Sequence, residues 1–178
     1  MLLGRIIGSG CILAGSIGLG VYFSTRESTR IKELNELKKA LTILSSEIEY
    51  MAAPLATACQ HIATRVERTA SALFGHFATA LATSINMAPT ASTHHIWAQS
   101  LNYVMEKSFL TAEDFSILDG FGKTLGYLDK TLQKNAIHYT TTYIDHTIGS
   151  LEEKSIKNKK MYRSLGVIGG LLITIILW

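Results

Sequence analysis

Residues 31 to 51 read IKELNELKKALTILSSEIEYM, and the pattern of this stretch indicates the fold class. Its apolar residues recur at intervals of three and four, which is the period of one face of an α-helix. This face comprises Ile31, Leu34, Leu41, Leu44, Ile48 and Met51, and it leaves Lys32, Glu33, Glu36, Lys38 and Lys39 outside. A long amphipathic helix is therefore predicted, and Pro54 is expected to end it.

The same period predicts three more helices between residues 55 and 109, the first of which has Pro54 in its opening turn. Their apolar faces are Leu55, Ala58, Ile62 and Val66; then Leu73, Phe74, Phe77, Leu81 and Ile85; then Ile96, Trp97, Leu101, Val104 and Phe109. Residues 86 to 93 (NMAPTAST) contain a proline and small polar residues without periodicity. They are therefore expected to form a loop between the second and third of these helices.

A local signal predicts the start of a fifth helix. Thr111 is followed three residues later by the carboxylate of Asp114, which is the spacing of a capping box. The expected apolar faces of this helix and of a last, long helix are Phe115, Leu118, Phe121 and Leu125, ending near Gly126, and then Leu132, Ala136, Tyr139, Tyr143, Thr147 and Leu151. Because no alternating strand pattern of useful length occurs, the sequence predicts an all-α fold, a bundle of about six helices around one core.

The two ends of the chain are apolar, whereas the middle is charged. Residues 6 to 23 contain no charged side chain, and as a helix they would span ~27 Å, close to the thickness of a bilayer. A retained transmembrane helix within residues 1–23 is predicted over a signal peptide, since no small-x-small cleavage site follows. Residues 161–178 predict a short second membrane segment, with a buried core helix or an interfacial segment as the alternative. Residues 24–160 are the expected domain.

Basic residues gather beside both predicted membrane segments. Five lie in residues 24–40 and five in residues 150–164, whereas Arg5 alone precedes the first segment. This asymmetry predicts that the domain faces the cytoplasm. Residues 41–149 hold six basic and nine acidic residues, which argues against nucleic-acid binding. Cys11 and Cys59 fall in different parts of the chain, so no disulfide is expected.

Small residues recur at four-residue spacing in both apolar ends. They are Gly4 and Gly8; Gly10, Ala14 and Gly18; and Gly166 and Gly170. Such a face lets helices pack closely in lipid, as in a homo-oligomer. Glycine is also simply common in transmembrane helices, and the pattern does not separate the two interpretations.

No catalytic constellation is recognisable in the sequence. Residues 122–124 (GKT) have the ending of a phosphate-binding loop, but Ile117 stands where that motif needs a glycine. The histidines lack the spacing of a metal site, and His61 and His76 are the least implausible ligands among them. The sequence therefore predicts a protein that is not an enzyme and has no metal or cofactor. A membrane-bound, metal-dependent enzyme or sensor is the alternative.

Three stretches carry a family resemblance. They are residues 41–55 (LTILSSEIEYMAAPL), residues 118–129 (LDGFGKTLGYLD) and residues 159–172 (KKMYRSLGVIGGLL). The second contains the pattern FG-x-x-LG-x-x-D, at Phe121, Gly122, Leu125, Gly126 and Asp129. Together with the apolar start and end, these stretches resemble the stage III sporulation protein AB family over the whole chain.

The resemblance implies roles for particular residues. Glu47 and Glu49, expected on one exposed face, are candidates for partner binding together with Tyr50. The five residues of the FG-x-x-LG-x-x-D pattern are expected to serve helix packing. The expected membrane-border motif is Lys159, Lys160, Met161, Tyr162, Arg163, Gly166 and Gly170. For Lys154, Lys157, Lys159 and Lys160, attraction to anionic lipid is the alternative to a protein contact.

The resemblance also implies a function without catalysis. Family members belong to the channel complex between mother cell and forespore, and they are similar in fold to the cytoplasmic domain of the platform protein of type II secretion and type IV pilus machines. The chain would sit in the mother-cell membrane around the forespore. It would pass mechanical input from a cytoplasmic ATPase, stage III sporulation protein AA, to membrane partners. The alternative within this class is a platform of another pilus or secretion system.

Overall fold

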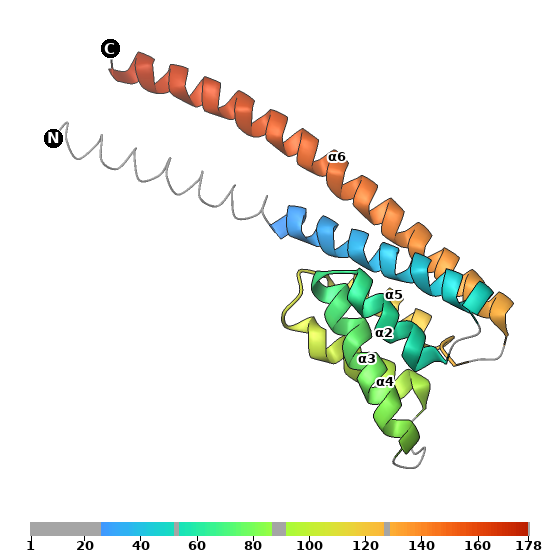
Figure 1. Ribbon diagram of the computed structural model, residues 1–178. Helices are drawn as coiled ribbons and strands as arrows, with labels where there is room; N and C mark the ends of the chain where they lie inside the picture. The colour runs from blue at the N-terminus through green and yellow to red at the C-terminus, as the bar shows by residue number, and fades with distance from the viewer. Residues whose placement is uncertain (1–25, 52–53, 87–91, 127–128, 178) are drawn as a thin grey trace. The chain divides into compact units, whose positions relative to one another are not determined.

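The computed structural model describes residues 26–51, 54–86, 92–126 and 129–177, and it describes side chains as far as Lys154. Within these residues the chain is all-α, as predicted, and six α-helices form a bundle (Figure 1). They are a first helix at residues 26–46, α2 at Leu55–Arg65, α3 at Arg68–Asn86, α4 at Thr93–Met105, α5 at Ala112–Gly122 and α6 at Lys130–Leu177. A π-helical turn, η1, follows the first helix at Glu47–Met51. Residues Ser28–His146 form one compact unit.

The core of this unit is built around Trp97 of α4, whose side chain is fully buried. Its ring meets Phe74, Phe77 and Phe121 edge to face, at centroid distances of 5.6, 5.0 and 5.6 Å. The indole N–H donates to the carbonyl oxygen of Leu118 at 2.8 Å, so its one polar group is satisfied. Trp97 therefore joins α3, α4 and α5 in one aromatic cluster.

The first helix buries Leu34, Leu37, Leu41 and Leu44, which lie on or beside the predicted face. One side chain expected outside that face is buried as well. Glu33 is 4% exposed and accepts a hydrogen bond from the backbone N–H of Phe109 at 2.9 Å. Its placement outside the apolar face was wrong because the loop after α4 supplies the partner that a buried carboxylate needs.

The buried face of α6 differs from the predicted one. Ile137, Thr140 and Ile144 are buried, whereas Leu132 and Tyr139 are 44% and 66% exposed. Thr140 can enter the core because its hydroxyl donates to the carbonyl oxygen of Ala136 at 2.9 Å. The sequence pattern followed the larger apolar residues, and two of these lie on the surface.

Between residues 105 and 114, one predicted helix boundary is wrong and one is confirmed. The fourth helix ends at Met105, so Phe109, which was placed on its apolar face, lies beyond the helix and is 42% exposed. The capping box of α5 is confirmed, because the Thr111 hydroxyl accepts from the Asp114 N–H and the Asp114 carboxylate accepts from the Thr111 N–H.

The predicted span within residues 1–23 lies outside the described residues. For the predicted membrane segment at residues 161–178, the description comprises the helical backbone of α6 to Leu177. Across the described part of the chain, no helix combines the length and the apolar composition needed to cross a bilayer.

Candidate partner-binding surface

Two ion pairs join the first helix and the η1 turn that follows it to α6. Lys38 contacts Asp145 at 2.6 Å, and Glu49 contacts Lys134 at 3.1 Å. Lys38 and Glu49 are eleven residues apart, and so are Lys134 and Asp145, a separation of about three helical turns on each segment. The first helix and the part of α6 up to His146 therefore run antiparallel and side by side, as Figure 1 shows for the blue-to-cyan helix and the start of the orange one.

This antiparallel arrangement gives the bundle two distinct ends along the helix pair. Residues 28 and 146, where the chain enters and leaves the compact unit, both lie on the same side of the Glu49–Lys134 pair, and this side is called here the tether end. Residues 49–51 and 130–134 lie at the opposite end, called the distal end.

The distal end carries a group of exposed apolar side chains. Tyr50, which adjoins Glu49, is 79% exposed. Leu132 and Tyr139, two and five residues from Lys134, are 44% and 66% exposed. We call Glu49, Tyr50, Leu132, Lys134 and Tyr139 the distal patch. Leu132 and Tyr139, seven residues apart, share one side of α6, and Lys134 lies on a different side of this helix. Exposed apolar side chains of this kind are found at protein-binding surfaces.

Glu47 does not lie on this surface, although it was expected on one exposed face with Glu49. It is 6% exposed, whereas the Glu49 side chain is 43% exposed. Glu47 follows the buried Leu44 by three residues, so ordinary helical spacing places it on the same, core-facing side as Leu44. Glu47 Oε1 lies 3.8 Å from His61 Nδ1, and Oε2 has no hydrogen-bond partner among the described residues.

A second buried carboxylate, Asp114, lies towards the tether end and is held by five hydrogen bonds. Arg30 donates to its two oxygens at 2.9 and 3.0 Å, and Thr111 donates both its backbone N–H and its hydroxyl. The hydroxyl of Tyr143 on α6 donates at 3.2 Å. Burial by itself raises the pKa of Asp114, but the hydrogen bonds and charge of Arg30 and the bonds from Thr111 outweigh it, so the pKa lies below its ordinary value of 3.8.

Sequence analysis assigned Asp114 only to a helix cap. The link to Arg30 spans 84 residues, and no local pattern signals it. This cluster ties the first helix, α5 and α6 together. It is a structural feature, because its hydrogen-bonding groups already satisfy one another.

The residues of the FG-x-x-LG-x-x-D pattern lie at the end of α5 and the start of α6. Phe121 and Leu125 are buried, and a Cβ on Gly122 would lie 2.0 Å from Trp97 Cδ1. Gly126 has a φ of +86°, which a side chain rarely tolerates. Asp129 accepts hydrogen bonds from the N–H groups of residues 131 and 132 at 2.8 and 3.2 Å. The pattern thus positions the turn between two helices.

The side chains of the predicted membrane-border motif, between Lys159 and Gly170, lie outside the described ones. Their backbone belongs to α6.

The two histidines singled out as potential metal ligands have other contacts. His61 faces Glu47, and His76 Nδ1 bonds the Ser100 hydroxyl at 2.9 Å while its ring stacks on Tyr103. Among the residues that the structure describes, no three acidic, histidine or cysteine side chains lie close enough to hold a metal ion. Burial raises the pKa of the Cys59 thiol to about 12, so this group is protonated at neutral pH.

Comparison with known proteins identifies the family. The family model for stage III sporulation protein AB matches residues 5–178. Stage III sporulation protein AB of Bacillus subtilis (strain 168) is 31% identical over 173 residues, which cover 97% of this chain and 98% of that protein. A solved structure of a stage III sporulation protein AB matches with a TM-score of 0.64 and 30% identity, over 72% of this chain and 97% of the other. The chain therefore belongs to the stage III sporulation protein AB family.

Proposed function

We propose that this protein is a non-catalytic platform of the sporulation channel complex, coupling a cytoplasmic ATPase to components in the membrane. Residues 24–160 form its cytoplasmic domain, and residues 1–23 and 161–178 anchor that domain in the mother-cell membrane around the forespore. Membership of a sporulation family favours this role over that of a platform in another secretion or pilus system.

The observation that carries the proposal is the antiparallel pairing of the first helix with α6. Because Lys38 pairs with Asp145 and Glu49 with Lys134, both connections out of the domain start at the tether end. Two membrane anchors that leave a domain at one end can enter the same bilayer without a long connecting loop. The five basic residues between 150 and 164 support this arrangement, since each is worth roughly 1 kcal/mol beside an anionic surface.

The distal patch supports a partner on the opposite side of the domain. Tyr50, Leu132 and Tyr139 are exposed apolar side chains, and the Glu49–Lys134 pair adds charge that can orient a partner. A cytoplasmic motor that docks here would act on the end of the domain furthest from its anchors. The candidate motor is stage III sporulation protein AA.

Transmission of force requires that the bundle move as one body. Three carboxylates tie the first helix to the rest of the unit: Glu33 accepts from Phe109 N, Glu36 accepts from Glu67 N, and Asp114 accepts from Arg30. Each bond joins segments at least 31 residues apart. A push at the distal patch would therefore be resisted at three points along the first helix and not absorbed by sliding of the helices.

The test is binding of the full-length chain, reconstituted in lipid nanodiscs, to purified stage III sporulation protein AA. The variant Glu49→Lys reverses the charge of the distal patch. Its matched control is Asp145→Lys, which alters the other exposed ion pair of the same two helices and changes the net charge equally. We expect Glu49→Lys to weaken binding at least tenfold and Asp145→Lys to leave it nearly unchanged.

Equal loss of binding in both variants would indicate a non-specific charge effect and contradict docking at the distal patch. Absence of binding by the unchanged protein would contradict the ATPase as partner. Tyr50→Ala adds a test that does not alter charge, and it should weaken binding as well, because exposed tyrosines commonly contribute much of the binding energy at interfaces.

A further inference from the structure

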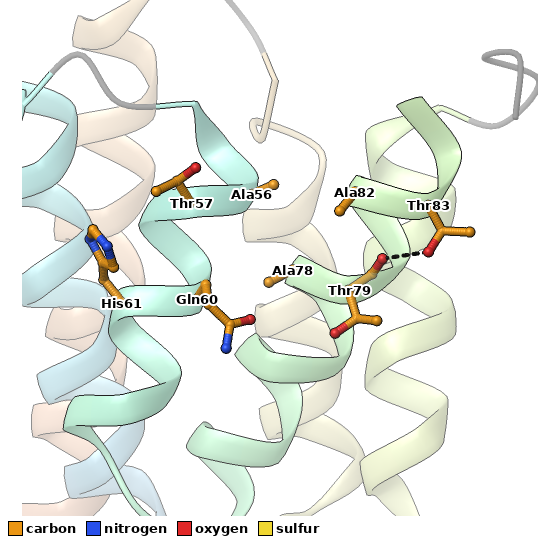
Figure 2. Close-up of a pocket in the computed structure, with 8 residues that line it drawn as sticks. All are labelled: Ala56, Thr57, Gln60, His61, Ala78, Thr79, Ala82 and Thr83. Atoms are coloured by element: carbon orange, nitrogen blue, oxygen red, sulfur yellow. Dashed lines mark hydrogen bonds between the residues drawn. The ribbon is translucent and has the colours of Figure 1, made fainter. Parts of the chain in front are cut away.

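A groove lies between α2 and α3, on a part of the bundle that the proposed function does not use. The two helices are close near their connecting turn, where Ser71 donates to the Ala63 carbonyl at 2.8 Å and a Cβ on Gly75 would lie 3.6 Å from that of Ala63. Away from the turn they enclose a volume of about 630 Å³, open to solvent (Figure 2). This volume falls within the range of ligand-binding clefts.

The lining of the groove is apolar in part and otherwise offers hydrogen-bond acceptors. Alanine methyl groups come from both helices, at Ala56, Ala78 and Ala82. The hydroxyls of Thr79 and Thr83 donate to carbonyl oxygens of their own helix, at Gly75 and Thr79, both at 2.9 Å (Figure 2). Their protons are therefore used, and their oxygens remain able to accept. None of the eight lining residues is a lysine or an arginine.

An uncompensated carboxylate lies behind one wall of this groove. His61 lies at the edge of the groove, with a side chain 47% exposed that projects from α2 on the side away from α3 (Figure 2), and its ring is 3.8 Å from Glu47. Glu47 is only 6% exposed, and its Oε2 has no hydrogen-bond partner among the described residues. His61 Nδ1 lies 3.8 Å from Glu47 Oε1, beyond hydrogen-bonding distance. A buried carboxylate in this state is costly and is stabilised by any cation that reaches it.

We infer that the groove between α2 and α3 binds a segment of a partner protein that inserts one lysine or arginine side chain past His61 to pair with Glu47. The half-exposed imidazole can turn outward and admit the cation. The alanine methyls would contact the aliphatic part of the inserted side chain, and the threonine oxygens would accept hydrogen bonds from other polar groups of the partner segment. Glu47 stands in η1, and π-helical turns are frequent at functional sites. This inference does not depend on docking of the ATPase.

The probe for the test is butylguanidinium, which carries the head and stem of an arginine side chain, and butylurea is its uncharged counterpart. The full-length chain in detergent micelles, with methyl-labelled alanine and threonine, places NMR reporters in the groove itself, at Ala56, Ala78, Ala82, Thr79 and Thr83. Titration at physiological salt should give saturable shifts of these signals with butylguanidinium. The same concentrations of butylurea should give no saturable shifts.

The variant Glu47→Gln should raise the dissociation constant about tenfold or more, since it removes a charged hydrogen bond. Glu113→Gln, an exposed carboxylate on α5, is the matched control and should leave it unchanged. An unchanged affinity in Glu47→Gln, or equal shifts with butylurea, would overturn the inference. If Glu47→Gln does not fold, Ala82→Leu decides, because it fills the groove without touching Glu47. If Ala82→Leu still shows the same shifts with butylguanidinium, the probe binds outside the groove and the inference is overturned.

Discussion

Two buried carboxylates on opposite parts of the bundle show how much the surroundings of one functional group can differ. Asp114 is 2% exposed and Glu47 is 6% exposed, so both are shielded from water. Asp114 accepts from Arg30, Thr111 and Tyr143. Glu47 has one oxygen without a hydrogen-bond partner among the residues that the structure describes, and a histidine at 3.8 Å. Burial alone therefore does not tell whether a carboxylate is structural, and the number of donors around it does.

The difference has an energetic consequence. A buried charge with well-placed donors is lost only at a large cost, because its partners are left unsatisfied in turn. A buried charge without such donors already reduces stability, and its removal costs little. The following changes test this comparison in order of expected effect.

The largest effect is expected from Asp114→Asn. This change keeps the size of the side chain but removes the charge that Arg30 meets at 2.9 Å. We expect the free energy of unfolding to fall by about 3 kcal/mol, as for other broken buried pairs. Urea denaturation of the full-length chain in detergent, followed by far-UV circular dichroism, measures it. Glu113→Gln, the exposed neighbour in the same helical turn, should be nearly neutral, and an equal loss in both variants would contradict the assignment.

The unchanged protein and Asp114→Asn should also differ in how their stability depends on pH. Because the pKa of Asp114 is lowered in the folded state, the stabilisation is fully present above its ordinary value of 3.8 and is lost as the pH falls through the lower folded value. The difference in unfolding free energy between the unchanged protein and Asp114→Asn should therefore be constant near neutral pH. It should narrow below about pH 4. A difference that stays constant through the acid range would contradict the role of the ionised carboxylate.

A smaller effect, of opposite direction, is expected from Glu47→Gln. The amide removes the uncompensated charge and keeps the packing, so the free energy of unfolding should stay within about 1 kcal/mol or rise. The measurement is the same denaturation experiment as for Asp114→Asn. A loss of stability as large as that of Asp114→Asn would mean that Glu47 has strong partners, and the comparison between the two carboxylates would fail.

The smallest effects are expected from the two exposed ion pairs. Double-mutant cycles to alanine at Lys38 and Asp145, and at Glu49 and Lys134, should each give a coupling energy of roughly 0.2–1 kcal/mol that declines with added salt. Their four side chains are between 41% and 53% exposed, which explains the low value. A coupling well above this range at Glu49–Lys134 would mean that the distal patch is rigid in the free protein.

Local patterns in the sequence were read correctly where the responsible residues are neighbours in the chain. The capping box at Thr111 and Asp114 needs a hydroxyl and a carboxylate three residues apart, and it formed as predicted. The apolar face of the first helix was found largely because Leu34, Leu41 and Leu44 share one side of a regular helix. The family pattern at residues 121–129 marked a turn whose glycines have no room for side chains or need positive φ.

Errors occurred where distant segments decide which side chain is buried. Leu132 and Tyr139 fit a helical apolar face, yet α6 turns Ile137 and Thr140 to the core. Glu33 fits an exposed face, yet Phe109, 76 residues away, satisfies it. Glu47 was expected on the surface with Glu49, yet it lies three residues after Leu44 on the buried side of the helix.

The sequence by itself determined that this protein is a helical bundle of the stage III sporulation protein AB family, because helical period, caps and family motifs are written in neighbouring residues. The tertiary structure decided which of two buried carboxylates is satisfied, which residues form the distal patch, and that a groove opens beside His61. The physical reason is that burial and hydrogen bonding depend on contacts between segments that are distant in the sequence. Arg30 and Asp114, for example, are 84 residues apart.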